Sequence, residues 1–390
     1  MTDTTLTLSL ERLPSSATLE PLWRALEGRS DGGFFISWTW VSCWLAGLPP
    51  RIQPQLLVAR DGDRVMGLAV VVSRLGLRRG CIPVRTACLH ETGDPVCDGI
   101  TIEHNDFLVS RDAPDTLRQQ MLAHWLQADR RSEEFRLAYL GRSVARVLPA
   151  EPLTTNVTEY GAYHVDLAAI RTAGTDYLGS LKQRSRYLVR KSLKRLGETA
   201  PLSLLVAQTV EEARRQFGEL KRLHTEYWAA RGDKGAFGSL FAEQFHDRLI
   251  SVGVPRGEVV VLSVCRGEQV LGYFYYFCFG GRVHYYQSGI DYGVVESTDS
   301  PGLAAHALAI EHFLGQGHDL YDFMAGDYQY KRTLASGTQT LYWTTLQRAS
   351  VKLRVESALL QRARQARDWW ARRRSTPPPA SAGAAAENSP

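Results

Sequence analysis

Two segments of the chain, far apart in the sequence, carry the same pattern. VARDGDRVMGLAVVVS begins at Val58 and VCRGEQVLGYFYYF begins at Val264, and each joins two apolar runs through a turn of glycine and an acidic residue. Aligned without gaps, the copies have identical residues at three pairs of positions, Gly62 and Gly267, Val65 and Val270, and Gly67 and Gly272. Apolar runs on either side of such a turn predict a β-hairpin in each segment.

The surroundings of the two copies repeat as well. A helical, aromatic segment precedes each copy, at 38–48 and 217–228, and a further helical run follows each, at 116–126 and 303–313. A chain of 390 residues is long enough for two domains. The sequence therefore predicts an α/β (α+β) fold of two tandem domains, with mixed central sheets flanked by helices.

Composition divides the chain into four parts. Residues 1–150 form the predicted first domain and 151–349 the second, whose first strand is expected at YHVDLA, near Tyr163. Residues 350–374 are predicted to form a basic helix, and the Pro- and Ala-rich segment 375–390 is expected to be disordered. The N-terminus lacks a basic start and a long apolar stretch, and no apolar run is long enough to cross a bilayer, so a cytoplasmic protein is expected.

One segment concentrates positive charge. Residues 182–195, KQRSRYLVRKSLKR, contain seven Lys or Arg and no acidic residue. On a helix, basic residues four apart repel one another, so a nearby anion would stabilise the row. A phosphate-bearing substrate, a nucleic acid or acidic side chains elsewhere in the fold would serve, and a solvated helix face is the alternative. The candidate substrate-binding residues are Arg184, Arg186, Arg190 and Lys191.

A second segment, SPGL at 300–303, has the residues of a helix start that can hold an anion. Ser300 suits the N-cap, Pro301 suits the first helical position, and Gly302 lets a ligand approach the backbone. Free N–H groups and the positive end of the helix dipole favour a pyrophosphate there, although plain capping explains the same residues. Strand-like segments precede and follow this helix, which predicts a β-α-β unit with its ligand beyond the strand ends.

Three stretches together resemble one protein family. LKQRSRYLVRKSLKRLGE is similar to the Arg-rich helix that the family places at the start of its second unit, and SPGLAAHALAIEHFLGQG to the helix after its donor strand. YDFMAGDYQYKR resembles the family element D-F-x-x-G-[DE]-x-x-Y-K. The chain thus resembles the GNAT acyltransferases, and among them the CelD/BioF-like acetyltransferases, which are related to the Fem (FemAB) peptidyltransferases. The likeness covers most of 20–345, although the loop at 299–304 has a single glycine where the family loop has more.

The resemblance implies two GNAT-like domains that together catalyse N-acyl transfer. The first would be degenerate, because residues 1–150 contain no counterpart of SPGL or of the Gly-Asp-x-x-Tyr-Lys element, and it would be structural or shape the acceptor cleft. In such an enzyme an amine attacks the carbonyl of acyl-CoA, most simply acetyl-CoA, and no metal takes part. The acceptor would be a small or phosphate-bearing molecule, anionic or linked to a sugar or nucleotide, as in envelope or polysaccharide biosynthesis.

The same resemblance gives roles to residues. A carboxylate would take the amine proton and a Tyr or Lys would protonate the leaving group, and the candidates are Asp327, Tyr330, Lys331 and Asp322. For Asp322, a structural hydrogen bond or a salt bridge to Lys331 is the alternative. A splayed strand at 286–290 would supply backbone donors for the oxyanion. The candidate donor-binding residues are Ser300, Pro301, Gly302, Leu303, Ser288 and Gly289, and the candidates for the acceptor pocket are Tyr227 and Trp228.

Two other functions remain open at this point. A Fem-like aminoacyl transferase would take its acyl group from charged tRNA, and the basic segments would then contact RNA phosphates. A non-catalytic GNAT scaffold would instead bind envelope or polysaccharide machinery, with the basic helix at 350–374 docking on a membrane surface or a partner protein. Neither the histidines near 284–318 nor the six scattered cysteines form a metal-binding pattern.

Overall fold

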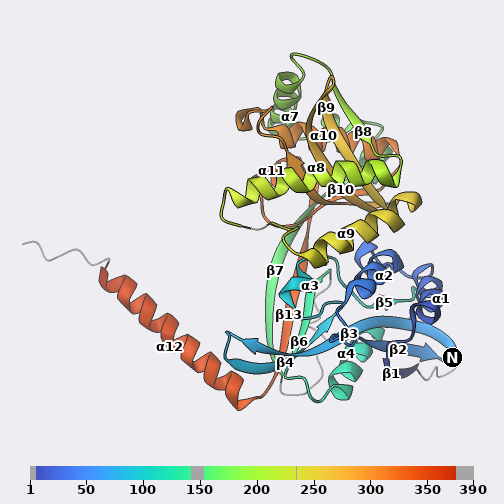
Figure 1. Cartoon of the computed structure of the whole chain (residues 1–390), viewed down its shortest axis with the longest axis vertical. Helices are drawn as coiled ribbons and strands as arrows, with labels where there is room; N and C mark the ends of the chain where they lie inside the picture. Colours follow the sequence, from blue (N-terminus) through green and yellow to red (C-terminus); the bar gives the residue numbers. More distant parts are fainter. Residues whose placement is uncertain (1–5, 142–152, 234, 375–390) are drawn as a thin grey trace, which may run out of the picture.

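A computed structural model describes residues 6–141, 153–233 and 235–374 of the chain (Figure 1). The tail at 375–390, which we expect to be disordered, lies outside the described residues. The elements of the first half are β1 (Leu6–Arg12), α1 (Ser16–Glu27), α2 (Trp38–Gly47), β2 (Gln55–Asp61), β3 (Arg64–Arg78), β4 (Ile82–Leu89), α3 (Pro95–Asp98), β5 (Leu108–Val109), α4 (Leu117–Ala128) and β6 (Glu134–Leu140).

The second half continues the alternation of helices and strands. Its elements are β7 (Leu153–Asp166), α5 (Leu167–Thr172), α6 (Tyr177–Ser180), α7 (Gln183–Leu196), β8 (Leu202–Val206), α8 (Val210–Ala229), α9 (Leu240–Gly253), β9 (Val259–Arg266), β10 (Gln269–Phe279), β11 (Arg282–Ile290), α10 (Pro301–Gly315), β12 (Leu320–Ala325), α11 (Gln329–Leu334), β13 (Gly337–Arg348) and α12 (Val351–Arg374). The helices predicted from periodicity are all present, and β7 begins ten residues before the predicted strand start at Tyr163. In the described part of the chain, no helix has the length and apolarity needed to cross a membrane.

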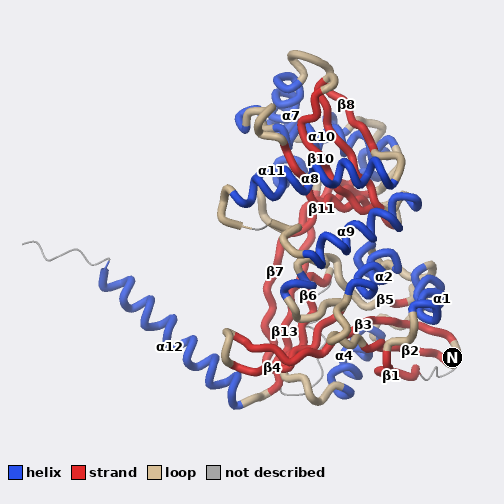
Figure 2. Tube along the Cα trace, in the orientation of Figure 1, coloured by secondary structure: helices blue, strands red, loops and turns tan. Residues whose placement is uncertain are grey.

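The mixed sheets of the two halves are joined into one. The strand order is β1-β2-β3-β4-β6-β13-β7-β12-β11-β10-β9-β8, and β5 pairs with β3 outside this path. The junction is made by β7 and β13, which pair antiparallel along Leu153–His164 and Gly337–Arg348 and run through both halves (Figure 2). Because β13 also pairs with β6, the last strand of the predicted second domain completes the sheet of the first. The two long strands β7 and β13 therefore connect the sheets of the two halves.

The repeated pattern forms the two predicted hairpins. β2 and β3 pair antiparallel, as do β9 and β10. Gly62 and Gly267 occupy equivalent turn positions with φ of +55° and +59°, a backbone conformation that glycine adopts without strain. The repeated sequence pattern therefore corresponds to a hairpin that occurs twice in the structure.

One hydrophobic core spans both halves. The ring of Phe34, from the first half, stacks on Phe277 of β10 at 4.5 Å between centroids, and Trp40 of α2 contacts Phe245 of α9 at 4.8 Å. A second core lies on the other face of the second half's sheet, where Ile310 and Phe313 of α10 pack with strand residues. Since aromatic packing of this kind is fully buried, the halves are expected to unfold together.

Close packing between α8 and β11 gives the first testable prediction. A Cβ added at Gly289 would lie 2.6 Å from the Leu220 carbonyl oxygen, which is backbone and cannot turn away. Gly289→Ala is therefore expected to reduce the free energy of unfolding by about 1–3 kcal/mol, measured by urea denaturation. Gly218→Ala, at an open position of α8 itself, is the matched control and should stabilise the protein slightly because alanine favours helix. Equal stability of both variants would contradict this packing.

Candidate active site

Strands β11 and β12 run parallel and then diverge. They pair only over Arg282–His284 and Leu320–Asp322. Beyond that point β11 continues along β10, while β12 follows β7 on its other edge. The divergence confirms the predicted splay at 286–290, and in the described chain it leaves the β12-facing edge of β11 without a strand partner. Unpaired N–H groups on such an edge are suitable donors to an oxyanion.

The side chains at the divergence alternate between the two faces of the sheet. Tyr321 and Phe323 pack in the core beneath α10, whereas Met324 belongs to the core shared with the first half. Asp322, between the two aromatic residues, therefore faces the first half. His284 has the same orientation, because its neighbours Val283 and Tyr285 pack under α10. Where the strands diverge, one face of the sheet thus carries the polar side chains of Asp322 and His284, and α10 packs on the other face.

Asp322 is fully buried, accepts two hydrogen bonds and lies in ion-pair contact with a third group. Its Oδ1 accepts from the backbone N–H of Met324 at 2.7 Å, and its Oδ2 accepts from the Gln339 side-chain amide at 3.0 Å. The third group comes from the first half, because His104 Nε2 lies 2.9 Å from Oδ2. This distance places the Nε2 proton toward the carboxylate, so Nδ1 is the ring nitrogen of His104 that remains for chemistry.

His104 and Asp322 shift each other's titration. Burial lowers the pKa of His104, but the negative charge of Asp322, with that of Glu103, raises it and holds the net pKa above the ordinary value. Burial raises the pKa of Asp322, but the charge of His104 and the hydrogen bond from the Met324 N–H lower it, so this pKa lies well below its usual range. A buried carboxylate that fixes the tautomer of an imidazole prepares that ring to act as a general base.

His284 lies beside this pair. Its Nδ1 is 3.8 Å from Asp322 Oδ2, and neither ring nitrogen has a hydrogen-bond partner among the described residues. Burial lowers the pKa of His284 to about 3, so the ring is neutral. Within the described chain, His104, His284 and Asp322 are the one group whose ligand atoms, all within 4.8 Å of one another, are placed to share a metal ion. His104 Nε2 lies 2.9 Å from Asp322 Oδ2 but, like both nitrogens of His284, forms no hydrogen bond of good geometry among the described residues.

Side chains from both halves of the chain form hydrogen bonds with the turn after β12. Glu103 accepts a hydrogen bond from the Ala325 N–H at 2.7 Å, and Lys331 Nζ donates to the carbonyls of Met324 and Ala325 at 3.1 and 2.6 Å. These contacts hold Met324 at φ +67°, a strained conformation for a residue with a side chain. The buried Lys331 therefore positions this turn, and a salt bridge from Lys331 to Asp322 is wrong, because Asp322 pairs with His104.

The first half reaches the divergence through residues 100–105. The Tyr286 hydroxyl of β11 donates to the Ile100 carbonyl, and the buried Asn105 amide donates to the Leu89 carbonyl at 2.9 Å. His104 itself has φ of +49°, so its side chain is presented from a left-handed backbone position. Both ends of the segment are thus anchored, which supports the expectation that the first half shapes the site.

On the opposite face, the basic helix α7 lies along the start of α10. The Ser192 hydroxyl donates to the carbonyls of Asp299 and Ser300 at 2.9 and 3.0 Å, and Arg195 pairs with Asp299 at 3.6 Å. A Cβ added at Gly302 would have one neighbour, Ile290 Cδ1 at 4.0 Å, so a ligand can approach the backbone there. The two predicted anion-binding features, separate in sequence, therefore share one surface.

Two details of those features differ from the predictions. Ser300 precedes α10, but its side chain makes no capping hydrogen bond and its φ is +53°, so the predicted side-chain N-cap is wrong. Its carbonyl is instead used, accepting from Ser192 and Leu303. On α7, Arg186 donates to the carbonyls of Gly179 and Leu181 at 2.7 and 2.8 Å and is structural. The other candidates of the row, Arg184, Arg190 and Lys191, are exposed.

Asp327 and Tyr330 lie away from the His104–Asp322 pair. Asp327 is 61% exposed and bonds Tyr163 and Arg332, and the hydrogen bond from Tyr163, followed by the charge of Arg332, lowers its pKa. A carboxylate of lowered pKa is a weak base. Tyr330 stacks on His306 beneath α10 at 5.4 Å, and burial raises the pKa of its hydroxyl, which stays protonated.

The remaining candidates surround the far end of β11. The Ser288 carbonyl accepts from His224 Nδ1 at 3.2 Å, and Gly289 admits the close approach of α8 described above. Tyr227 of α8 stacks on Tyr292 at 5.7 Å, and Trp228 beside it is half-buried. These residues hold β11 against α8 at the divergence.

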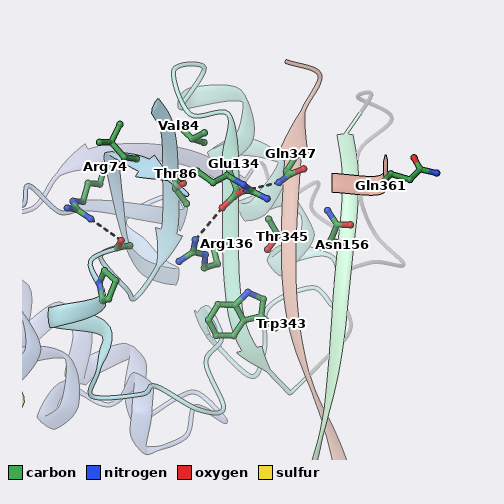
Figure 3. A pocket seen from close by; sticks show the side chains of 15 residues that line it. Arg74, Val84, Thr86, Glu134, Arg136, Asn156, Trp343, Thr345, Gln347 and Gln361 are labelled. Carbon is green, nitrogen blue, oxygen red and sulfur yellow. Dashed lines mark hydrogen bonds and ion pairs between the residues drawn. The ribbon is translucent and has the colours of Figure 1, made fainter. Parts of the chain in front are cut away.

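A hollow lies over the sheet where strands β4 and β6 of the first half adjoin β13. It has a volume of about 1200 Å³ and is lined by Arg74, Arg78, Glu134, Arg136 and Trp343, among others (Figure 3). Its cations are paired, Arg74 with Asp94 and both Arg78 and Arg136 with Glu134. The hollow therefore offers little uncompensated positive charge to a phosphate.

Comparison with known proteins supports the fold described above. Residues 183–332, which include α7, α10 and the divergence, match the family described as acetyltransferase (GNAT) domain. The crystal structure of FemX superposes with a TM-score of 0.54 at 12% identity, covering 86% of this chain and 96% of that one. The fold is the GNAT fold.

Two further solved structures extend the likeness over both halves. L-PGS from Bacillus licheniformis has a TM-score of 0.52 at 12% identity and covers 90% of this chain and 97% of its own. The C-terminal domain (DUF2156) of a putative lysylphosphatidylglycerol synthetase from Agrobacterium fabrum has a TM-score of 0.52 at 11% identity, with 89% and 95% covered. No curated protein matches the chain by sequence.

Proposed function

We propose that this chain is an N-acyltransferase of the CelD/BioF-like kind, which moves an acyl group, acetyl in the simplest case, from acyl-CoA to an amine. The observation that carries the proposal is the buried His104–Asp322 pair at the divergence of β11 and β12. It faces the first half, while the start of α10 and the exposed cations of α7 lie on the other face. A donor held at α10 and an acceptor beside His104 would meet at the divergence.

The reaction needs one proton acceptor and one set of oxyanion donors. The amine nitrogen attacks the thioester carbonyl, the C–N bond forms and the C–S bond breaks. Nδ1 of His104 takes the proton from the attacking nitrogen, while Asp322 holds Nε2 and stabilises the imidazolium that results. The edge N–H groups of β11 bind the oxyanion, and CoA leaves as a thiol after protonation from solvent.

The acceptor class follows from the charges around the site. Arg184, Arg190 and Lys191 are exposed on α7, and they suit either the phosphates of CoA or those of a phosphate-bearing acceptor. An amine on an anionic, sugar- or nucleotide-linked molecule, as in envelope or polysaccharide biosynthesis, is the acceptor we propose. The alternative is a Fem-like transferase that takes its acyl group from charged tRNA, and the chain shares its fold with FemX.

Donor binding is testable before any acceptor is known. Acetyl-CoA at about a hundredfold excess over its Kd is expected to stabilise the protein by about 2.7 kcal/mol, seen as a rise in Tm. Gly302→Trp should abolish the rise, because the indole occupies the open approach to α10. Gly315→Trp, at an open position at the other end of α10, should retain it. No rise with any of several acyl-CoAs would overturn the acyl-CoA donor and favour charged tRNA.

A further inference from the structure

Helix α12 leaves the body of the protein after β13 and projects outward (Figure 1). Its first turns are anchored. Glu356, which is 5% exposed, pairs with Arg78 at 2.8 Å and with Arg79 at 2.9 Å, and Lys352 pairs with Glu133 at 2.7 Å. The following turns lie progressively farther from the sheet. A helix held at one end lacks packing contacts along the rest of its length, and most helices in proteins take their stability from such packing.

An apolar stripe runs along α12. Val351, Val355, Leu359 and Trp370 are 68%, 52%, 60% and 57% exposed. At 3.6 residues per turn, these four positions fall within an arc of about 100°, which also contains the long side chains of Lys352 and Arg362. Beside the stripe, Ile82 together with Val351, Val355 and Leu359 lines a shallow hollow of about 580 Å³. Large apolar side chains gathered on one exposed face mark a surface that is covered in the working protein.

The positive charge of α12 indicates which kind of partner covers the apolar stripe. Residues 351–374 contain eight Lys or Arg and two acidic residues, and one of the acidic residues, Glu356, is already neutralised by Arg78 and Arg79. A second copy of this helix would be repelled by like charge. A nucleic acid would match the charge, but it would leave the valine, leucine and tryptophan side chains in water. A bilayer with anionic headgroups satisfies the cations and the apolar stripe together.

We propose that α12 is an interfacial anchor, which lies in the surface of a bilayer containing anionic lipid. Val355, Leu359 and Trp370 enter the boundary between headgroups and acyl chains, and Arg354, Arg362 and Arg367 contact the headgroups. Long arginine side chains reach the headgroup phosphates while their stems stay on the apolar side. This inference is independent of the acyl-transfer chemistry, since α12 contributes no residue to the divergence of β11 and β12.

The test is co-sedimentation of the full chain with lipid vesicles. Vesicles of equal parts phosphatidylglycerol and phosphatidylcholine should bind the chain at least tenfold more tightly than pure phosphatidylcholine, and added salt should weaken the binding. Val355→Asp with Leu359→Asp should weaken binding at least tenfold. Leu205→Asp, on the edge strand β8 where the side chain is 56% exposed, is the matched control and should bind like wild type.

The Tm of each variant shows whether it is folded. Both should keep the Tm of wild type and its rise with acetyl-CoA, so loss of vesicle binding would not reflect unfolding or failure of the donor site. Equal binding to the two vesicle types, or binding that survives Val355→Asp with Leu359→Asp, would overturn the proposal. So would a concentration-dependent dimer of wild type that the double variant abolishes, because the stripe would then be covered by a second copy.

Discussion

His104→Gln is expected to lower the rate of acyl transfer by about 10²–10⁴-fold, the range that removal of a general base produces. Gln keeps an N–H that can reach Asp322 but offers no basic nitrogen to the amine. Steady-state kinetics with one amine acceptor measures the effect. The rise in Tm with acetyl-CoA should persist in this variant, because the donor is held on the α10 face, so the loss would lie in kcat.

The pH profile separates a base from a structural residue. Asp322 holds the pKa of His104 above its ordinary value, so His104 is the neutral base only at higher pH. The wild-type rate should therefore rise with pH through an apparent pKa above about 6.5, the unperturbed value. In His104→Gln that limb should be lost with the same amine. An unchanged limb would assign it to the substrate amine and contradict the role of His104.

Asp322→Ala is expected to reduce the free energy of unfolding by about 3–5 kcal/mol, the effect of breaking a buried ion pair. The change leaves the Met324 N–H, the Gln339 amide and His104 without their shared acceptor. Urea denaturation of the purified variant measures it.

Asp327→Ala is the matched control for Asp322→Ala. Asp327 lies five residues farther along the same chain segment but is exposed, and its partners Arg332 and Tyr163 can turn to water. We expect its denaturation midpoint to stay close to that of wild type. A large loss at Asp327 with a small one at Asp322 would mean that the buried pair is not what holds the turn after β12.

Local sequence patterns predicted the elements that depend on interactions between residues close together in the sequence. The hairpins around Gly62 and Gly267 and the basic helix α7 depend on turn residues, periodicity and short-range pairing, and they are present in the structure. The side-chain cap at Ser300 failed because its carbonyl, rather than its hydroxyl, is used by a partner on another helix.

The pairing of His104 with Asp322 could not be found in this way. The two residues are 218 positions apart, and they meet only because β7 and β13 join the halves and the segment 100–105 packs against β11. The one local signal is EHND at 103–106, a polar run between apolar residues. Asp322 and Asp327 stand in the same recognisable motif, and burial favours Asp322 as the partner of a base.

The most direct test of the account is release of CoA thiol from acetyl-CoA in the presence of a panel of amines, compared between wild type, His104→Gln and Asp327→Ala. The account predicts amine-dependent release by wild type, a loss of about 10²–10⁴-fold in His104→Gln, and a rate close to wild type in Asp327→Ala. Release that persists in His104→Gln and disappears in Asp327→Ala would contradict it, and would move the chemistry from the buried pair to the surface carboxylate.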